Sequence, residues 1–260
     1  MKWMIAAALL AASCAGASAQ DDRALPPLVE RAFAAGTEAP DEAHWQFTMV
    51  ADMGEHGQFT ARFDSTRPEA ERWTLIEPAS PDQMSDDLRQ TWENTREPDD
   101  DDAAEDEADS DDGNSRSFSV GGGGSGLFFG AGSTDFIAGG VREIRNTPNQ
   151  IIYAFDPDLA DDDEDDAMAR TLGENLRGEL TVARRDPFVE RLRIHAPASF
   201  KPNFMVRIHA FEMELDFERR DGLPAPVMTR FLTRVEASAM MQRVNQFVEF
   251  RFSDIVYTAP

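Results

Sequence analysis

Cysteine is nearly absent from this sequence: Cys14 is the only one, so no intramolecular disulfide can form. Lysine is also scarce, since Lys2 and Lys201 are the only two and arginine supplies the other basic residues. The chain further lacks an apolar run of the roughly 20 residues that a transmembrane helix requires. These absences exclude a disulfide framework and predict that no helix spans a membrane.

Positive charge is in deficit: 25 Lys and Arg stand against 49 Asp and Glu, which gives a formal net charge of −24. Much of the excess lies in two runs, 97–112 and 156–166, which hold eleven and eight acidic residues and no basic one. The rest of the chain is only mildly acidic. A chain of this charge repels phosphate backbones, so nucleic acid is excluded as an expected partner.

Catalytic and metal-binding signatures are missing as well. There is no G-x-S-x-G nucleophile motif, and the glycine stretch 121–126 fits G-x-G-x-x-G only because it is nearly all glycine. The acidic runs do not follow the twelve-residue calcium-loop pattern. No two of the histidines have H-x-H or H-x-x-x-H spacing; they are His44, His56, His195 and His209. We therefore expect no enzyme activity, no metal and no cofactor.

The first residues resemble an export signal. They carry one positive charge at Lys2, an apolar run over 3–12 and small residues up to Ala19, the three parts of a secretory signal peptide. This pattern predicts cleavage after Ala19 and a periplasmic protein of a Gram-negative bacterium. The alternative is a lipoprotein anchored through Cys14, which also follows small residues.

Period-two alternation of apolar and polar residues predicts strands along most of the remaining chain. The pattern in 45–50 and 59–64 favours a β-hairpin, and 71–77 is expected to form a third strand. Further strands are expected at 141–145, 151–155, 178–184, 187–195, 203–218, 227–239 and 243–258. The strand 203–218 changes parity, with Phe204, Val206 and Ile208 apolar at first and odd positions from Phe211 onward. This slip predicts a bulge near 209–210.

Helical spacing is confined to three short segments. Residues 25–35, 81–96 and 167–176 each show an apolar stripe typical of an amphipathic helix. The acidic and glycine-rich stretch 97–126 offers almost no apolar area to offset its ordering entropy, so it is predicted to be disordered. We therefore expect one β domain over 20–260, interrupted by this insertion and by an acidic loop at 156–166.

Charges of opposite sign alternate along the C-terminal strands, which predicts cross-strand ion pairs on a solvated face. The residues concerned are Arg191, Arg193, Arg207, Arg230, Arg234 and Arg251 with Glu190, Glu212, Glu214, Glu236 and Glu249.

One known family shares part of this pattern. An amphipathic helix, a hairpin with aromatic residues, and the sequence Arg62 to Pro68 leading to Trp73 resemble the periplasmic carriers of outer-membrane lipoproteins. The resemblance covers 25–76 by motif and 178–258 by its strand pattern. It implies an unclosed, curled antiparallel sheet with helices lidding an apolar concave face that carries acyl chains. The insertion from 97 to 140 departs from the family.

These observations predict a mainly β fold with a few helices, in which a curled antiparallel sheet forms an unclosed half-barrel. The expected function is non-enzymatic binding or carriage of a lipid, acyl chain or other apolar ligand on the concave face. The alternative is an envelope scaffold whose acidic segments contact a basic partner or divalent cations. The expected ligand-binding residues are Trp45, Phe47, Phe59, Phe63, Trp73, Phe211, Phe217, Phe231, Phe250 and Phe252.

Overall fold

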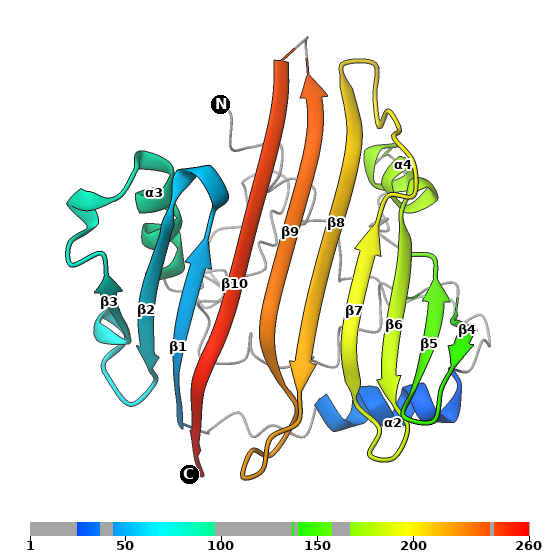
Figure 1. Cartoon of the computed structure of the whole chain (residues 1–260), viewed down its shortest axis with the longest axis horizontal. Helices are drawn as coiled ribbons and strands as arrows, with labels where there is room; N and C mark the ends of the chain where they lie inside the picture. The colour runs from blue at the N-terminus through cyan, green and yellow to red at the C-terminus, as the bar shows by residue number, and fades with distance from the viewer. Residues whose placement is uncertain are drawn as a thin grey trace, which may run out of the picture.

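The computed structural model describes residues 25–36, 44–96, 137, 140–157, 167–239 and 242–259. Ten antiparallel strands in these residues form one open, curled sheet in the order β3-β2-β1-β10-β9-β8-β7-β6-β5-β4 (Figure 1). The strands are β1 His44–Asp52, β2 Gln58–Asp64, β3 Trp73–Glu77, β4 Arg142–Asn146, β5 Gln150–Phe155, β6 Arg177–Ala183, β7 Val189–His195, β8 Val206–Glu218, β9 Val227–Ala239 and β10 Gln242–Thr258. The predicted mainly β fold with an unclosed antiparallel sheet is confirmed.

Helices are few and short in the described part of the chain. The α-helices are α2 Pro27–Gly36, α3 Asp86–Arg96 and α4 Ala167–Asn175, and the 3-10 helices are η1 Gly54–His56, η2 Glu69–Glu71 and η3 Pro81–Gln83. The α-helices lie within or close to the three segments in which helical spacing was found, but α3 begins at Asp86 and the first residues of the predicted segment 81–96 form the separate 3-10 helix η3. Among the described residues, no helix combines the length and apolar character needed to span a membrane.

The last strand joins two meanders into one sheet. Strands β1 to β3 form one meander and β4 to β9 the other, and β10 pairs with β9 on one side and with β1 on the other. As a result β3 and β4, which follow each other along the chain, lie at opposite edges of the sheet (Figure 1). Every strand pairs antiparallel with its neighbours. Side chains of directly paired residues therefore point to the same face of the sheet, and alternate residues along a strand share that face.

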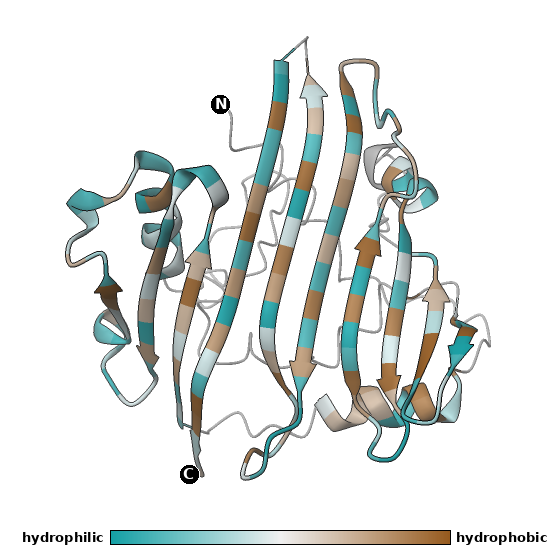
Figure 2. Cartoon of the chain, viewed as in Figure 1, coloured by the Kyte–Doolittle hydropathy of each residue, from teal (hydrophilic) through white to brown (hydrophobic). Residues whose placement is uncertain are grey.

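The two faces of the sheet differ sharply in polarity, as the alternation of hydrophobic and hydrophilic residues along the strands in Figure 2 shows. We call one side of the sheet the apolar face; it is the side on which buried side chains pair with one another across neighbouring strands. On the long strands these are Trp45, Phe47, Met49, Ala51, Phe59, Ala61, Phe63, Ile208, Phe211, Leu215, Phe231, Val235, Ala237 and Phe252. The polar face carries the residues between them.

The predicted change of parity in β8 is present. The pairing of β8 with β9 shifts register between Ile208 and Ala210, which is a β-bulge at the expected place. The bulge returns Ile208 and Phe211 to the same apolar face, where they lie opposite Ala237 and Val235. One expectation was wrong: β8 begins at Val206, and Phe204 lies outside the strand and is 89% exposed.

The described helices cover the flanks of the apolar face. In α3, Trp92 packs edge-on against Phe59 of β2, with ring centroids 5.5 Å apart. Helix α2 contacts β6 and β7, and Leu172 of α4 belongs to the same hydrophobic cluster. In Figure 1 these helices lie beside the outer strands, so among the described helices none lies across β9 and β10.

Some predicted segments lie outside the described residues. They are the signal peptide 1–19, the insertion 97–126, and the acidic loop 156–166 except for its first two residues. Ile137, beyond the insertion, is 5% exposed and belongs to the hydrophobic cluster.

Candidate functional site

All ten aromatic residues singled out from the sequence lie on the apolar face or at its edge. Nine of them are at most 8% exposed, while Phe250 is partly buried. They form two groups, one on the strands around β1 and one on the central strands β8, β9 and β10. The two groups differ in how their rings are packed.

In the group around β1, the aromatic rings pack directly against one another. Phe47 stacks on Phe63 of β2 with ring centroids 4.9 Å apart. Trp73 and Phe252 meet the Phe47 ring edge-on, at 5.6 Å and 5.7 Å. These offset and edge-on arrangements are the ones that aromatic pairs prefer. At this end, the apolar face is therefore a packed core.

The central strands present a different surface. Register places Leu215, Phe231 and Phe250 in one row across β8, β9 and β10. The next row along the strands is Met213, Thr233 and Val248. Phe231 stacks on Phe250 with centroids 6.1 Å apart. Met213, Val248 and Phe250 are only partly buried, so this part of the apolar face retains accessible apolar area.

Thr233 is the polar exception at the centre of that surface. Its side chain occupies an apolar position of β9 between Phe231 and Val235 and is 6% exposed. The hydroxyl oxygen is buried and has no hydrogen-bond partner among the described residues. A buried hydroxyl without a partner costs about 1–3 kcal/mol, so its place on the apolar face calls for an explanation.

Sequence reasoning missed Thr233. The signal was present, because Thr233 is the polar residue in the series Phe231, Thr233, Val235 and Ala237 on the apolar side of β9. Period two alone allows a threonine at such a position, since β-branched residues favour strands. The unsatisfied hydroxyl becomes visible only once the neighbouring strands are in place.

The polar face is an array of ion pairs centred on Arg230. Its guanidinium lies 2.6 Å from Glu214, 3.3 Å from Asp216 and 2.5 Å from Glu249, so it links three strands. Partial burial opposes the charge on Arg230, but hydrogen bonds to Glu249 and Asp216 outweigh burial and raise the pKa of the guanidinium. Arg191 adds a contact to Asp216 at 2.5 Å.

The predicted cross-strand ion pairs are present for Arg191, Arg193 and Arg230, and four other residues differ from the prediction. Arg234 and Arg251 pair with Glu236 and Glu249 of their own strands and not across strands. Arg207 and Glu190 form no ion pair with any described residue. The central array serves to hold β7, β8, β9 and β10 together on the solvated side.

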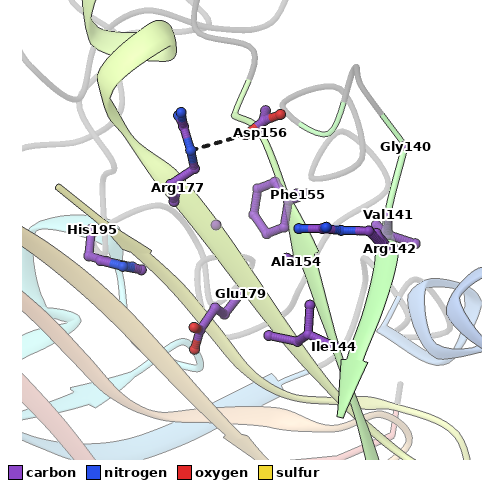
Figure 3. A pocket seen from close by; sticks show the side chains of 11 residues that line it. Gly140, Val141, Arg142, Ile144, Ala154, Phe155, Asp156, Arg177, Glu179 and His195 are labelled. Carbon is purple, nitrogen blue, oxygen red and sulfur yellow. Dashed lines mark ion pairs between the residues drawn. The ribbon is translucent and has the colours of Figure 1, made fainter. Parts of the chain in front are cut away.

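A hollow of about 690 Å³ opens near the β4 edge on the polar face (Figure 3). Arg142 enters it from β4, and Glu179 and His195 line it from β6 and β7. Arg177 also lines it, but this side chain already lies 3.5 Å from Asp156 and donates to two carbonyl groups at the end of α4. The hollow mixes both charges and has no hydroxyl or thiol nucleophile in its lining.

His56 and Ser85 come close together without forming a catalytic arrangement. His56 Nδ1 lies 2.8 Å from a carboxylate oxygen of Asp87. However, the Ser85 hydroxyl donates to the backbone carbonyl of His56 at 2.8 Å and accepts from the Leu88 N–H at the start of α3. Its role is thus to cap a helix. No cluster of metal-ligating side chains is present in the part of the chain that the structure describes.

The fold and site define an open antiparallel β-sheet protein with one aromatic-rich apolar face and one ion-paired polar face. Comparison with known proteins found no matching family model, no similar curated protein and no similar solved structure. The resemblance to lipoprotein carriers therefore stays a prediction.

Proposed function

We propose that this protein is a non-enzymatic, exported binding protein for a lipid acyl chain or other apolar ligand. The ligand lies against the apolar face of β8, β9 and β10. The observation that carries the proposal is the row Met213, Thr233 and Val248, where accessible apolar side chains surround a buried hydroxyl without a partner. Ligand sites are typically apolar with a few polar groups that fix orientation, and this row has that composition.

The packed rings around β1 support the proposal indirectly. A rigid aromatic core at one side of the sheet fixes the curvature of the neighbouring strands, so the central surface does not need the ligand in order to form. The polar face also helps to form the central surface in the absence of ligand, because the Arg230 ion pairs hold β8, β9 and β10 in register. Binding to a preformed surface costs less ordering entropy than binding to a flexible one.

The first experiment is direct. The protein is purified without detergent from its native compartment, and native mass spectrometry then looks for a bound lipid. Titration with a fluorescent fatty acid follows, using protein from which any bound lipid has been extracted. If no lipid co-purifies and the fatty acid shows no saturable binding, the proposal is refuted.

The second experiment places a charge on each face of the same strand. Val248→Glu puts a carboxylate on the apolar face of β10, whereas Asn245→Glu puts one on the polar face of that strand. We expect the first variant to weaken fatty-acid binding at least about tenfold and the second to leave it unchanged, because an unpaired charge is disfavoured against apolar groups. Met213→Gln tests the same surface from β8 with less risk to folding. Equal binding by all three variants would contradict the proposed site.

Export is a separate part of the proposal. We propose that residues 1–19 are removed and that the mature protein lies in the periplasm. N-terminal sequencing of the natural protein should then begin at Gln20. A lipid-modified N-terminus at Cys14 would instead show the anchored alternative.

A further inference from the structure

One end of the sheet presents an aromatic side chain to solvent. Phe204 is 89% exposed, more than any other large hydrophobic residue in the described part of the chain, and its neighbour Met205 is 44% exposed. The other exposed residues of this kind lie singly elsewhere, at 46% to 51%. Single exposed apolar residues are ordinary, but a nearly fully exposed phenylalanine beside a second apolar side chain is not.

The loop that carries Phe204 is held in a defined shape. Phe200 and Ile208 exchange backbone hydrogen bonds of 3.0 Å and 2.9 Å, which close the loop 201–207 at its base. Both residues are buried, at 8% and 1% exposed. Within the loop, the Asn203 side-chain oxygen accepts from the backbone N–H groups of Met205 and Val206, at 3.0 Å and 2.9 Å. The exposed phenylalanine therefore projects from an ordered loop and not from a loose one.

The two chain segments that form this end of the sheet carry charges of one sign. Segments 196–211 and 237–248 contain no Asp or Glu, although the chain has 49 acidic residues. They contain Lys201, Arg207 and Arg243, all exposed. Register places both arginines beside Ser238, one on each neighbouring strand, so they lie close together at the end of the sheet. In the described structure no carboxylate pairs with any of the three cations.

We propose that this end of the sheet, formed by the loop 201–207 and the adjoining ends of β8, β9 and β10, docks onto the surface of an anionic lipid bilayer. Phe204 and Met205 enter the interfacial region, and Lys201, Arg207 and Arg243 face the lipid phosphates. Interfacial anchors combine aromatic residues with Lys and Arg in this way, and cations contribute near a negatively charged surface. The proposal does not depend on an apolar ligand being bound to the apolar face.

A membrane fits the geometry better than a protein partner does. A stable protein interface buries about 800 Å² on each partner, which requires a broad complementary patch. Here only Phe204 and Met205 are exposed, and three cations without an ion pair to a described residue lie in the same two segments. The overall negative charge of the protein does not prevent docking, because interactions between exposed charges are largely screened beyond about 10 Å at 0.1 M salt. The orientation that brings the cations to the surface is thus the favoured one.

The test is co-sedimentation of the full mature protein with vesicles at about 0.1 M salt. One set of vesicles contains phosphatidylglycerol mixed with phosphatidylcholine, and the other contains phosphatidylcholine alone. We expect binding to the first set, weak or no binding to the second, and loss of binding when the salt is raised to about 1 M. Phe204→Asp should weaken binding at least about tenfold, and Arg207→Glu and Arg243→Glu about fivefold each.

Ile144→Asp is the matched control, because Ile144 is an exposed apolar residue, 48% exposed, on β4 at the far edge of the sheet. It should bind vesicles like the unchanged protein. Thermal unfolding of each variant shows that the fold is retained. Equal binding by Phe204→Asp and Ile144→Asp would overturn the proposal. So would a lack of binding to anionic vesicles at low salt, in which case the loop would be a contact for a protein partner. Fatty-acid binding should be unaffected by Phe204→Asp, which separates this test from that of the ligand site.

Discussion

Phe47 and Phe63 lie directly opposite each other on β1 and β2, with ring centroids 4.9 Å apart and ring planes inclined by 24°. Both rings are at most 2% exposed. Because Trp73 and Phe252 close around the same ring, Phe47 is the centre of the packed aromatic core. Side-chain packing therefore supports the sheet at this end, in addition to the backbone pairing of β1 with β2 and β10.

Replacing Phe47 by alanine should be strongly destabilising. The change removes a buried ring and leaves a cavity between rigid neighbours, so we expect a loss of about 3–5 kcal/mol in the free energy of unfolding. Thr48→Ala, at the adjacent position on the polar face, is the control and should cost less than about 1 kcal/mol. Urea unfolding followed by tryptophan fluorescence measures both. A loss below about 1 kcal/mol for Phe47→Ala would show that this end is open and not a packed core.

Arg230 should matter more than its exposed neighbour Arg234. Removing the Arg230 guanidinium leaves Glu214, Asp216 and Glu249 close together, and these carboxylates are only 13% to 19% exposed. We expect Arg230→Met to cost about 2–3 kcal/mol, below the range for a fully buried pair because the site is partly solvated. Arg234→Met should cost less than about 1 kcal/mol, since that side chain is 57% exposed. Similar losses for both variants would contradict the central role of Arg230.

Local features of the fold could be predicted from the sequence. Alternation along 45–50 and 59–64 identified the hairpin and its buried side, and the parity slip in β8 located the bulge between Ile208 and Ala210. Both are short-range consequences of the two-residue period of a strand. The same period made the apolar side chains of the aromatic face recognisable before their contacts were known.

Long-range features could not be predicted in the same way. The pairing of β10 with β1 joins the two ends of the chain, and nothing local in either strand specifies that partner. Phe204 was assigned to a strand by its parity, but the Asn203 side chain bonds to the following backbone N–H groups and delays the start of β8. The unsatisfied hydroxyl of Thr233 depends on neighbours from two other strands, so it too required the assembled sheet.

Glu190 should make stability depend on pH. Burial raises the pKa of its carboxyl above the ordinary value of 4.5, and Arg191 opposes this only in part. A raised pKa in the folded state means that the protonated form is favoured on folding, so stability is highest below the unfolded pKa and falls as pH rises through the folded pKa. We therefore expect Glu190→Gln to be more stable than the unchanged protein at neutral pH, with the difference disappearing below about pH 4.

Asp64 provides the control of opposite sign. The Thr66 hydroxyl donates to its carboxylate at 2.6 Å, and this bond, with the Thr66 backbone N–H, lowers the pKa of Asp64 below 3.8 although burial opposes it. The stabilisation is present above the unfolded pKa and is lost as pH falls through the folded pKa. Asp64→Asn should thus be less stable at neutral pH. Unfolding at a series of pH values measures both variants, and the same sign for both would refute this assignment.

Thr233→Val tests whether the unpaired hydroxyl lowers the stability of the protein. Valine has nearly the same shape but no polar group, so it relieves a buried, unsatisfied hydroxyl and should raise the free energy of unfolding by about 1 kcal/mol. Thr229→Val on the same strand is the control, because the Thr229 hydroxyl donates to the Asp216 carbonyl at 3.3 Å. That variant should lose about 0.5–1.5 kcal/mol. Denaturant titration without ligand measures the two changes.

Thr233→Val also tests why an unfavourable hydroxyl occupies the centre of the apolar face. If Thr233 hydrogen-bonds a polar atom of the ligand, Thr233→Val should bind a fluorescent fatty acid about tenfold more weakly, because the polar group of the ligand then loses its partner. Binding of a hydrocarbon probe that lacks this polar group should be unchanged. A stabilised Thr233→Val that binds both probes as tightly as the unchanged protein would show that the hydroxyl has no part in recognition. The ligand would then be held by apolar contacts with Met213, Val248 and Phe250 alone.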